Sequence, residues 1–107
     1  MRLREVCAAI GVTRRAVQGY EQAGLVAASG KTSRGYLLYD ELAQERIRKI
    51  KLFQEMGFSI KEISVIIDAP NSVLKAALQS QIEKLEKKGN RLQDLIVIAV
   101  EMIEALG

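Results

Sequence analysis

The chain has 107 residues, of which 49% are hydrophobic and 27% are charged, with one cysteine, one proline and no histidine. This length allows one compact domain and one extended element, and it makes the deep cleft of an enzyme improbable. A single cysteine cannot form an internal disulfide, and without histidine there is no second soft ligand for a metal ion, so neither a metal site nor a cofactor is expected.

Charge is distributed unevenly along the chain. The formal net charge is only +3, but residues 1–34 hold six basic and two acidic side chains, whereas residues 71–107 hold five of each. A basic first third beside a neutral last third is typical of a protein that binds nucleic acid at one end and another protein chain at the other.

The first predicted helix has four residues on one apolar face: Leu3, Val6, Cys7 and Ile10. This spacing is that of two helical turns, and Gly11 supplies the residue that accepts a left-handed C-cap. Cys7 lies on the inward face, so we interpret it as a small core residue and not as a redox sensor.

A second short helix is predicted directly after this turn. Thr13 is a good N-cap, the apolar side consists of Ala16, Val17 and Tyr20, and the helix ends at Ala23-Gly24. Two short helices joined by a three-residue turn that contains glycine are the helix-turn-helix arrangement.

Between Leu25 and Tyr39 the helical periodicity disappears. The segment VAASGKTSRG is rich in small and turn-forming residues and lies between two apolar ends, which predicts a short β-hairpin, or wing, with Lys31 and Arg34 at its tip.

Two further helices are predicted after the wing. Asp40 caps the longer one, which ends at Met56-Gly57, and Ser59 with Glu62 forms a capping box for the next, which Pro70 stops. The expected inward faces are Leu42, Ala43, Ile47, Ile50 and Phe53 or Gln54 in the first, and Ile60, Ile63, Ile66 and Ile67 in the second.

After Pro70 the sequence follows a heptad pattern. Leu78, Leu85, Leu92, Ala99 and Leu106 are seven residues apart, and Ile82, Ile96 and Ile103 follow four residues after a member of that series. This pattern predicts a coiled-coil seam or, alternatively, part of an intramolecular bundle. Because the winged domain has its own core, we expect pairing with a second copy through Leu78, Ile82, Leu85, Leu92 and Ile96.

Gly89 interrupts this heptad pattern. The segment Lys87-Lys88-Gly89-Asn90 has cations and a glycine as at a helix C-terminus, so either one long helix tolerates Gly89 or the chain turns and 91–106 form a separate helix. Of the two, we expect the turn. The stretch LIVIAVEMIEAL is apolar on more than one face, which suggests that it packs back on the coiled coil or on the partner head, or that it is the stub of a longer effector domain. Its most apolar part, LIVIAV, is too short to span a bilayer.

Three segments together resemble the MerR family of winged helix-turn-helix regulators over about residues 1–88: GVTRRAVQGYEQAGLV, GYLLYDE and KLFQEMGFSIKEISVII. The resemblance implies an all-α fold with a small β-hairpin wing, a DNA-binding domain over residues 1–70 and a dimerisation helix over 71–107. It also implies a bacterial homodimer with an antiparallel coiled coil, which bends and untwists promoter DNA and so affects RNA polymerase indirectly.

The chain departs from the family pattern in its second helix and in its wing. Gln18 and Gly19 stand where the family usually has arginine and an aromatic residue, Leu37 stands where it usually has arginine, and a common wing proline is missing. These departures bear on the phosphate contacts and on the operator sequence.

Arg14 and Arg15 lie in the first turn of the second helix, where the helix dipole disfavours cations unless an anion lies opposite. Phosphate or guanine is therefore their expected partner, and Gln18, one turn on, has the geometry to pair with adenine.

Other candidate contacts lie outside that face. Lys31 and Arg34 on the wing tip are expected to bind phosphates, as is Lys61 in the opening turn of the fourth helix. Tyr20 and Tyr36 are each either packing residues or hydroxyl donors to phosphate.

These features predict a sequence-specific, DNA-binding transcription regulator. No catalytic constellation is present, so an enzyme is not expected, and the first residues lack a signal-peptide pattern, which favours the cytoplasm and no membrane. The alternatives are a DNA architectural or excisionase-like accessory factor and a protein-interaction module whose basic face meets an acidic partner. The sequence identifies no small-molecule effector.

Overall fold

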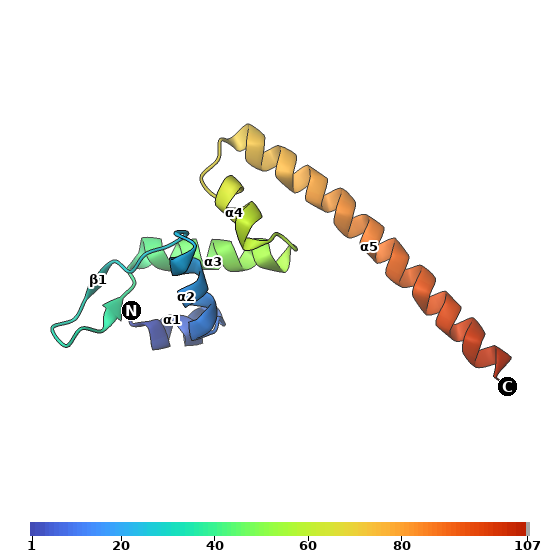
Figure 1. Ribbon diagram of the computed structural model, residues 1–107, viewed down its shortest axis with the longest axis horizontal. Coiled ribbons are helices and arrows are strands. Elements are labelled where there is room, and N and C mark those ends of the chain that lie inside the picture. The colour runs from blue at the N-terminus through green and yellow to red at the C-terminus, as the bar shows by residue number, and fades with distance from the viewer. Residues whose placement is uncertain (107) are drawn as a thin grey trace. The chain divides into compact units, whose positions relative to one another are not determined.

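The computed structural model describes residues 1–106. The chain forms two compact units: Met1–Ala69, called the head below, and a second unit that begins at Pro70. The head is mostly helical and contains one small hairpin, which stands out to one side of the helices (Figure 1). The predicted fold class is therefore confirmed.

Four helices and two strands make up the head. In chain order they are α1 (Leu3–Ile10), α2 (Arg14–Gln22), β1 (Gly30–Lys31), β2 (Leu37–Leu38), α3 (Glu41–Glu55) and α4 (Ile60–Ile66). Helix α1 packs on α2, α2 on α3, and α3 on α4. Figure 1 shows α1 and α2 beside α3, as in a helix-turn-helix.

The predicted helix caps are confirmed. The Thr13 side chain accepts a hydrogen bond from the Ala16 amide at 3.0 Å, and the Asp40 carboxylate accepts one from the Ala43 amide at 2.9 Å. Ser59 and Glu62 form the capping box of α4, and Gly11 has a φ of 78°, which places it in the left-handed region that favours glycine. Local side-chain chemistry therefore sets where these helices begin and end.

The core of the head consists of fully buried side chains from all four of its helices and from the residue after β2. They are Val6, Val17, Tyr39, Ile47, Ile50 and Ile63.

Leu42 was expected on the buried side of α3, but it is 75% exposed, so that prediction is wrong. It lies in the first turn of α3, where the helix borders an open hollow. Gln44 is buried instead, and its amide donates to the Tyr39 carbonyl at 2.9 Å.

The hairpin has two-residue strands in antiparallel register, with Gly30 opposite Leu38 and Lys31 opposite Leu37. The apolar residues that precede it, Leu25 and Val26, are buried in the head and are not part of a strand. The start of the chain adds a third, short segment to this sheet, because Arg2 forms an antiparallel β-bridge with Leu38.

The second unit contains one helix, α5 (Asn71–Ala105), with Pro70 at its N-cap. It runs through Gly89 without a break, so the turn expected there is wrong. Glycine inside a helix costs about 1 kcal/mol relative to alanine, whereas ending a helix leaves up to four carbonyl groups without helical partners. Among the described residues, no helix combines the length and apolarity that a membrane crossing requires.

Candidate nucleic-acid interface

Arg14, Arg15 and Gln18 lie exposed on α2, whose opposite side carries the buried Val17 and Tyr20. No acidic residue lies in the first turn of α2, and within residues 1–106 neither arginine has a carboxylate within ion-pair distance. The exposed side therefore combines two uncompensated guanidinium groups with an amide that both donates and accepts. This is the chemistry that base edges and phosphates require.

Gln22 extends the same surface and was missed in the sequence analysis. It is exposed and follows Gln18 by four residues, so it lies one turn further along α2. The four-residue spacing between Gln18 and Gln22 could have indicated from the sequence that both lie on the same face of the helix.

Tyr20 is a core aromatic, which was one of the two interpretations of this residue. It is 3% exposed, and its hydroxyl donates a hydrogen bond of 2.6 Å to Gln54 Oε1 on α3. Burial, with a smaller contribution from the Glu55 carboxylate, raises the pKa of Tyr20. The candidate phosphate contact at Tyr20 is therefore not supported, because the side chain lies inside the head.

The hairpin carries two exposed cations, three residues apart in the sequence. Arg34 lies in the turn, as predicted, while Lys31 lies in β1, just before the tip. Thr32 holds the turn, because its carbonyl accepts from the Gly35 amide at 2.9 Å and its hydroxyl accepts from the Tyr36 amide at 3.1 Å.

Tyr36 lies on the hairpin surface and is 52% exposed. The guanidinium carbon of Arg2 lies over its ring, 4.6 Å from the centroid. Arg2 was counted only as part of the basic first third of the sequence, and nothing local in the sequence signals this contact, because the two residues are far apart in the chain.

Two hydrogen bonds, one of them half-buried and the other exposed, connect the base of the hairpin to the helices. The Tyr39 hydroxyl donates to Glu21 Oε1 of α2 at 2.5 Å, and the Asp40 amide donates to the Ser29 hydroxyl at 2.8 Å. Burial, together with the hydrogen bond to Glu21, raises the pKa of Tyr39 above its ordinary value. The hydrogen bond between Tyr39 and Glu21 fixes the base of the hairpin relative to α2.

Arg46 connects the end of the helix-turn-helix to the end of α4. Its Nε donates to the Leu25 carbonyl, and its two terminal nitrogens each donate to an oxygen of Asp68 at 2.7 Å. We call this arrangement the Arg46 clamp. The guanidinium of Arg46 lowers the pKa of the Asp68 carboxyl. Sequence analysis did not find the clamp because its three members are distant in the chain.

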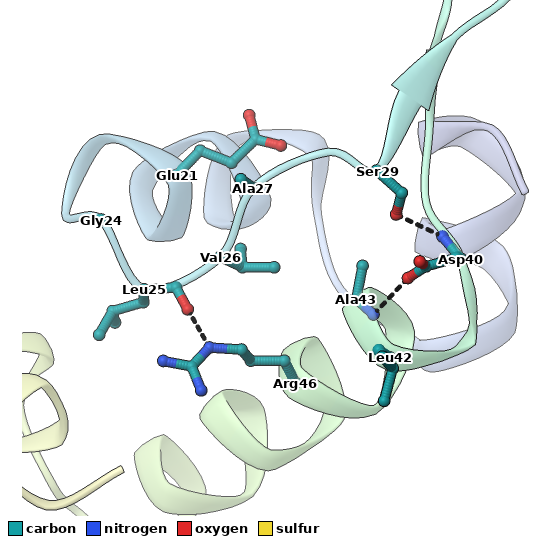
Figure 2. Close-up of a pocket in the computed structure, with 10 residues that line it drawn as sticks. All are labelled: Glu21, Gly24, Leu25, Val26, Ala27, Ser29, Asp40, Leu42, Ala43 and Arg46. Carbon is teal, nitrogen blue, oxygen red and sulfur yellow. Dashed lines mark hydrogen bonds between the residues drawn. The ribbon is translucent and has the colours of Figure 1, made fainter. Parts of the chain in front are cut away.

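An open hollow of about 590 Å³ lies between the segment after α2 and the first turns of α3. Figure 2 shows Arg46 reaching the Leu25 carbonyl at this hollow and Asp40 capping α3 at the Ala43 amide. Glu21, Asp40 and Arg46 each form a side-chain hydrogen bond within the head. We therefore interpret the hollow as a structural feature of the head and not as a ligand site.

Lys61 is exposed on α4, a helix of seven residues. Its side chain forms no hydrogen bond or ion pair in the described part of the chain that would join it to α2 or the hairpin. The structure thus places Arg14, Arg15 and Gln18 on α2, the candidates Lys31, Arg34 and Tyr36 on the hairpin, and Lys61 on α4.

Helix α5 exposes a row of apolar side chains. Of the five seam candidates, Leu78 is half-buried and Ile82, Leu85, Leu92 and Ile96 are exposed. Exposed apolar residues at heptad spacing are what a helix presents when its partner is another chain.

Comparison with known proteins gives one family. A model described as "MerR HTH family regulatory protein" matches residues 1–69. The HTH-type transcriptional activator mta of Bacillus subtilis is 39% identical over 94 residues, which are 88% of this chain and 37% of the activator. This chain therefore spans less than two fifths of that relative.

Solved structures agree with the family match. The N-terminal part of the Bacillus subtilis multidrug transporter activator, MtaN, is 36% identical with a TM-score of 0.78, covering 96% of this chain and 97% of that one. HiNmlR, described as a MerR family regulator lacking the sensor domain, bound to promoter DNA, shares the fold at 15% identity and a TM-score of 0.72, covering 90% of this chain and 77% of its own. The chain belongs to the MerR family of helix-turn-helix regulatory proteins.

Proposed function

We propose that this protein is a sequence-specific, DNA-binding transcription regulator that acts as a homodimer on promoter DNA. The observation that carries the proposal is the exposed set Arg14, Arg15 and Gln18 on α2, within a head that the family model spans from residue 1 to 69. The name of the related activator and the promoter DNA in the HiNmlR structure support it.

In this proposal α2 enters the major groove. Arginine binds the O6 and N7 atoms of guanine with two hydrogen bonds, and glutamine pairs in the same way with adenine. Arg14 or Arg15 and Gln18 would thus read neighbouring bases. The hairpin, through Lys31, Arg34 and Tyr36, and α4, through Lys61, would bind phosphates, which position the protein without selecting a sequence.

Pairing of two α5 helices would complete the binding unit. Burial of the exposed seam removes apolar surface from water. This burial stabilises the pair by about 25 cal/mol for each Å² of apolar surface. Two heads then bind half-sites about 34 Å apart, or a multiple of that distance, on one side of the duplex.

The dimer would act on transcription through the shape of the DNA. Bending and untwisting a promoter changes how RNA polymerase meets the two promoter elements, so contact with the polymerase need not be direct. We propose no catalytic activity, and we place the protein in the cytoplasm with the DNA that it binds.

Selection of bound fragments from genomic DNA, followed by binding measurements on the selected site, tests this function. We expect Arg15→Ala to weaken specific binding by about 1–3 kcal/mol and to flatten the preference at one base pair, because a bidentate contact is lost. Arg48→Ala on α3 is the control, since it removes an exposed arginine from another helix.

Two results would contradict the proposal. One is binding of the unaltered protein to duplex DNA that does not depend on salt or sequence; the other is an equal effect of both substitutions. Transcription in vitro from the selected promoter, with and without the protein, then distinguishes a regulator from an architectural factor.

A further inference from the structure

We propose that Arg2, held on the ring of Tyr36, is a further DNA contact that binds a backbone phosphate beside the hairpin. This inference rests on the proposed function of the head and adds a contact from the very start of the chain. The ligand is a phosphodiester of duplex DNA, so the contact contributes affinity and not sequence preference.

Backbone pairing places Arg2 on the hairpin. Arg2 forms an antiparallel bridge with Leu38 of β2, and the Tyr39 amide donates to the Met1 carbonyl at 2.7 Å. The first two residues thus extend the two-stranded sheet at the side of β2 opposite β1. The position of Arg2 is therefore fixed by main-chain contacts that do not depend on its side chain.

The guanidinium of Arg2 carries a charge that nothing in the head neutralises. Among residues 1–106, no carboxylate lies within ion-pair distance of it. Glu5, which is close in sequence, accepts a hydrogen bond of 3.1 Å from the backbone amide of Arg2. The N–H groups of the guanidinium are therefore available to a ligand.

The ring of Tyr36 orients this free group. With the guanidinium carbon 4.6 Å from the ring centroid, the contact is within the range of a cation–π interaction. Stacking occupies the face of the guanidinium and leaves donors at its edge, where an arginine binds phosphate oxygens in pairs. The stack also reduces the side-chain entropy lost on binding, because long side chains lose rotamer freedom when they are fixed.

The surroundings favour an anion. Residues 22–39 contain two cations, Lys31 and Arg34, and no acidic residue. Arg2 adds a third cation to this ribbon at its base, so a strand of DNA that follows the hairpin would meet positive charge at both its tip and its base.

Binding to the selected duplex across a salt series tests the contact. Each phosphate neutralised contributes about 0.9 to the slope of log K against log salt concentration. We expect Arg2→Ala to reduce the magnitude of the slope by about that amount and to weaken specific and non-specific sites by the same factor. Arg2→Lys should keep the slope but bind more weakly than the unaltered protein, because lysine lacks the planar fork.

Arg4→Ala is the matched control. It removes the same charge two residues away, from α1, where no aromatic ring holds the side chain. Equal slopes for Arg2→Ala and the unaltered protein would overturn the proposal, and so would equal losses for Arg2→Ala and Arg4→Ala. Thermal melting followed by circular dichroism checks the fold of each variant, and Arg2→Gln replaces Arg2→Ala if the latter is unstable.

Tyr36 separates the role of the stack from that of the hydroxyl. Tyr36→Phe keeps the ring and removes only the hydroxyl, so it should weaken binding less than Tyr36→Leu, which removes both. The additional loss in Tyr36→Leu should be smaller when Arg2 is already alanine, because coupled residues are not additive. Additive effects would contradict the stacked arrangement. Failure of the proposed function looks different, since the unaltered protein would then bind no duplex in a salt-dependent manner.

Discussion

At the scale of single residues, the Arg46 clamp joins two segments of the head that are distant in the chain. One guanidinium satisfies the carbonyl of Leu25, directly after the helix-turn-helix, and both oxygens of Asp68, directly after α4. A planar group with donors in fixed directions can do this, and lysine cannot. Arg46 therefore joins the segment that leaves α2 to the far end of the head.

The clamp predicts a specific loss of stability in acid. Because Arg46 lowers the pKa of Asp68 in the folded head, the unfolded chain, with a pKa of about 3.9 for aspartate, binds the proton more readily. The contribution of Asp68 is therefore complete above the unfolded pKa and is lost as pH falls through the lower folded pKa. We expect the free energy of unfolding in urea, measured from pH 6 to pH 2, to fall less in Asp68→Asn than in the unaltered protein.

Asp94→Asn is the control for this measurement, because Asp94 lies on α5 and forms no ion pair within residues 1–106. Its profile should parallel that of the unaltered protein. The pKa of Asp40 is also lowered, by the hydrogen bond from Ala43 and the one with Ser29, but this carboxyl is present in every variant and cancels in the difference. Identical profiles for Asp68→Asn and the unaltered protein would show that the clamp does not stabilise the head.

Residues whose roles depend on near neighbours in the chain were predictable. Thr13, Asp40 and Ser59 cap helices through contacts three residues away, and such contacts follow from side-chain type and spacing alone. The Arg46 clamp and the stack of Arg2 on Tyr36 join residues far apart in the chain, so no local pattern contains them.

At the scale of elements, the sequence predicted a turn at Gly89, whereas α5 is one continuous helix. Cations followed by glycine and asparagine are typical of a helix end, yet the same residues lie inside a 35-residue helix. A glycine only lowers the stability of a helix, and the apolar heptads on both sides extend it past that point. The residues near Gly89 therefore mark a position of lower helix stability and not the end of a helix.

Gly89→Ala is expected to stabilise the protein. A Cβ at this position meets no atom within 4 Å, and alanine is favoured over glycine in a helix by about 1 kcal/mol. Circular dichroism during thermal unfolding should show a higher midpoint and at least unchanged helix content.

The reverse substitution Ala76→Gly, at an exposed position of α5, is the matched comparison and should lower the midpoint by a similar amount. If Gly89→Ala instead lowers the midpoint while Ala76→Gly behaves as expected, a second chain approaches the helix backbone at Gly89, which continues the series of Ile82 and Ile96.

The hairpin was predictable in kind but not in extent. Small and turn-forming residues indicated a turn, but the apolar residues Leu25 and Val26 serve the core of the head and not a strand. The β-bridge of Arg2 with Leu38 joins residues that are far apart in the sequence, so no pattern near either residue predicts it.

At the scale of the whole molecule, the basic surface and the apolar seam lie in different units of the chain. The head already encloses its own core, while α5 exposes Ile82, Leu85, Leu92 and Ile96. The division follows from charge and heptad patterns in the sequence, and for that reason the general plan of the protein was accessible before the structure. The identity of any effector was not, because no pattern in these residues points to one.

Leu92→Asp is expected to convert the proposed dimer into a monomer. A carboxylate in an apolar seam loses its hydration, which opposes association, and light scattering coupled to size-exclusion chromatography measures the change in mass. Binding to a site with two half-sites should fall to the level of a single half-site, because the second head no longer adds effective concentration.

Asn90→Asp, a nearly isosteric change two residues away and outside the seam series, is the control and should remain dimeric. A monomeric mass for the unaltered protein, or a dimer that survives Leu92→Asp, would refute pairing through this face.

The Arg46 clamp also fixes an order of events during synthesis. Helix α2 and the hairpin leave the ribosome first, and the guanidinium of Arg46 emerges 22 residues before the carboxylate that it binds. A nascent chain therefore carries every residue proposed to contact DNA on α2 and the hairpin before the clamp can form. The clamp can therefore close only after translation has passed Asp68, beyond the end of α4.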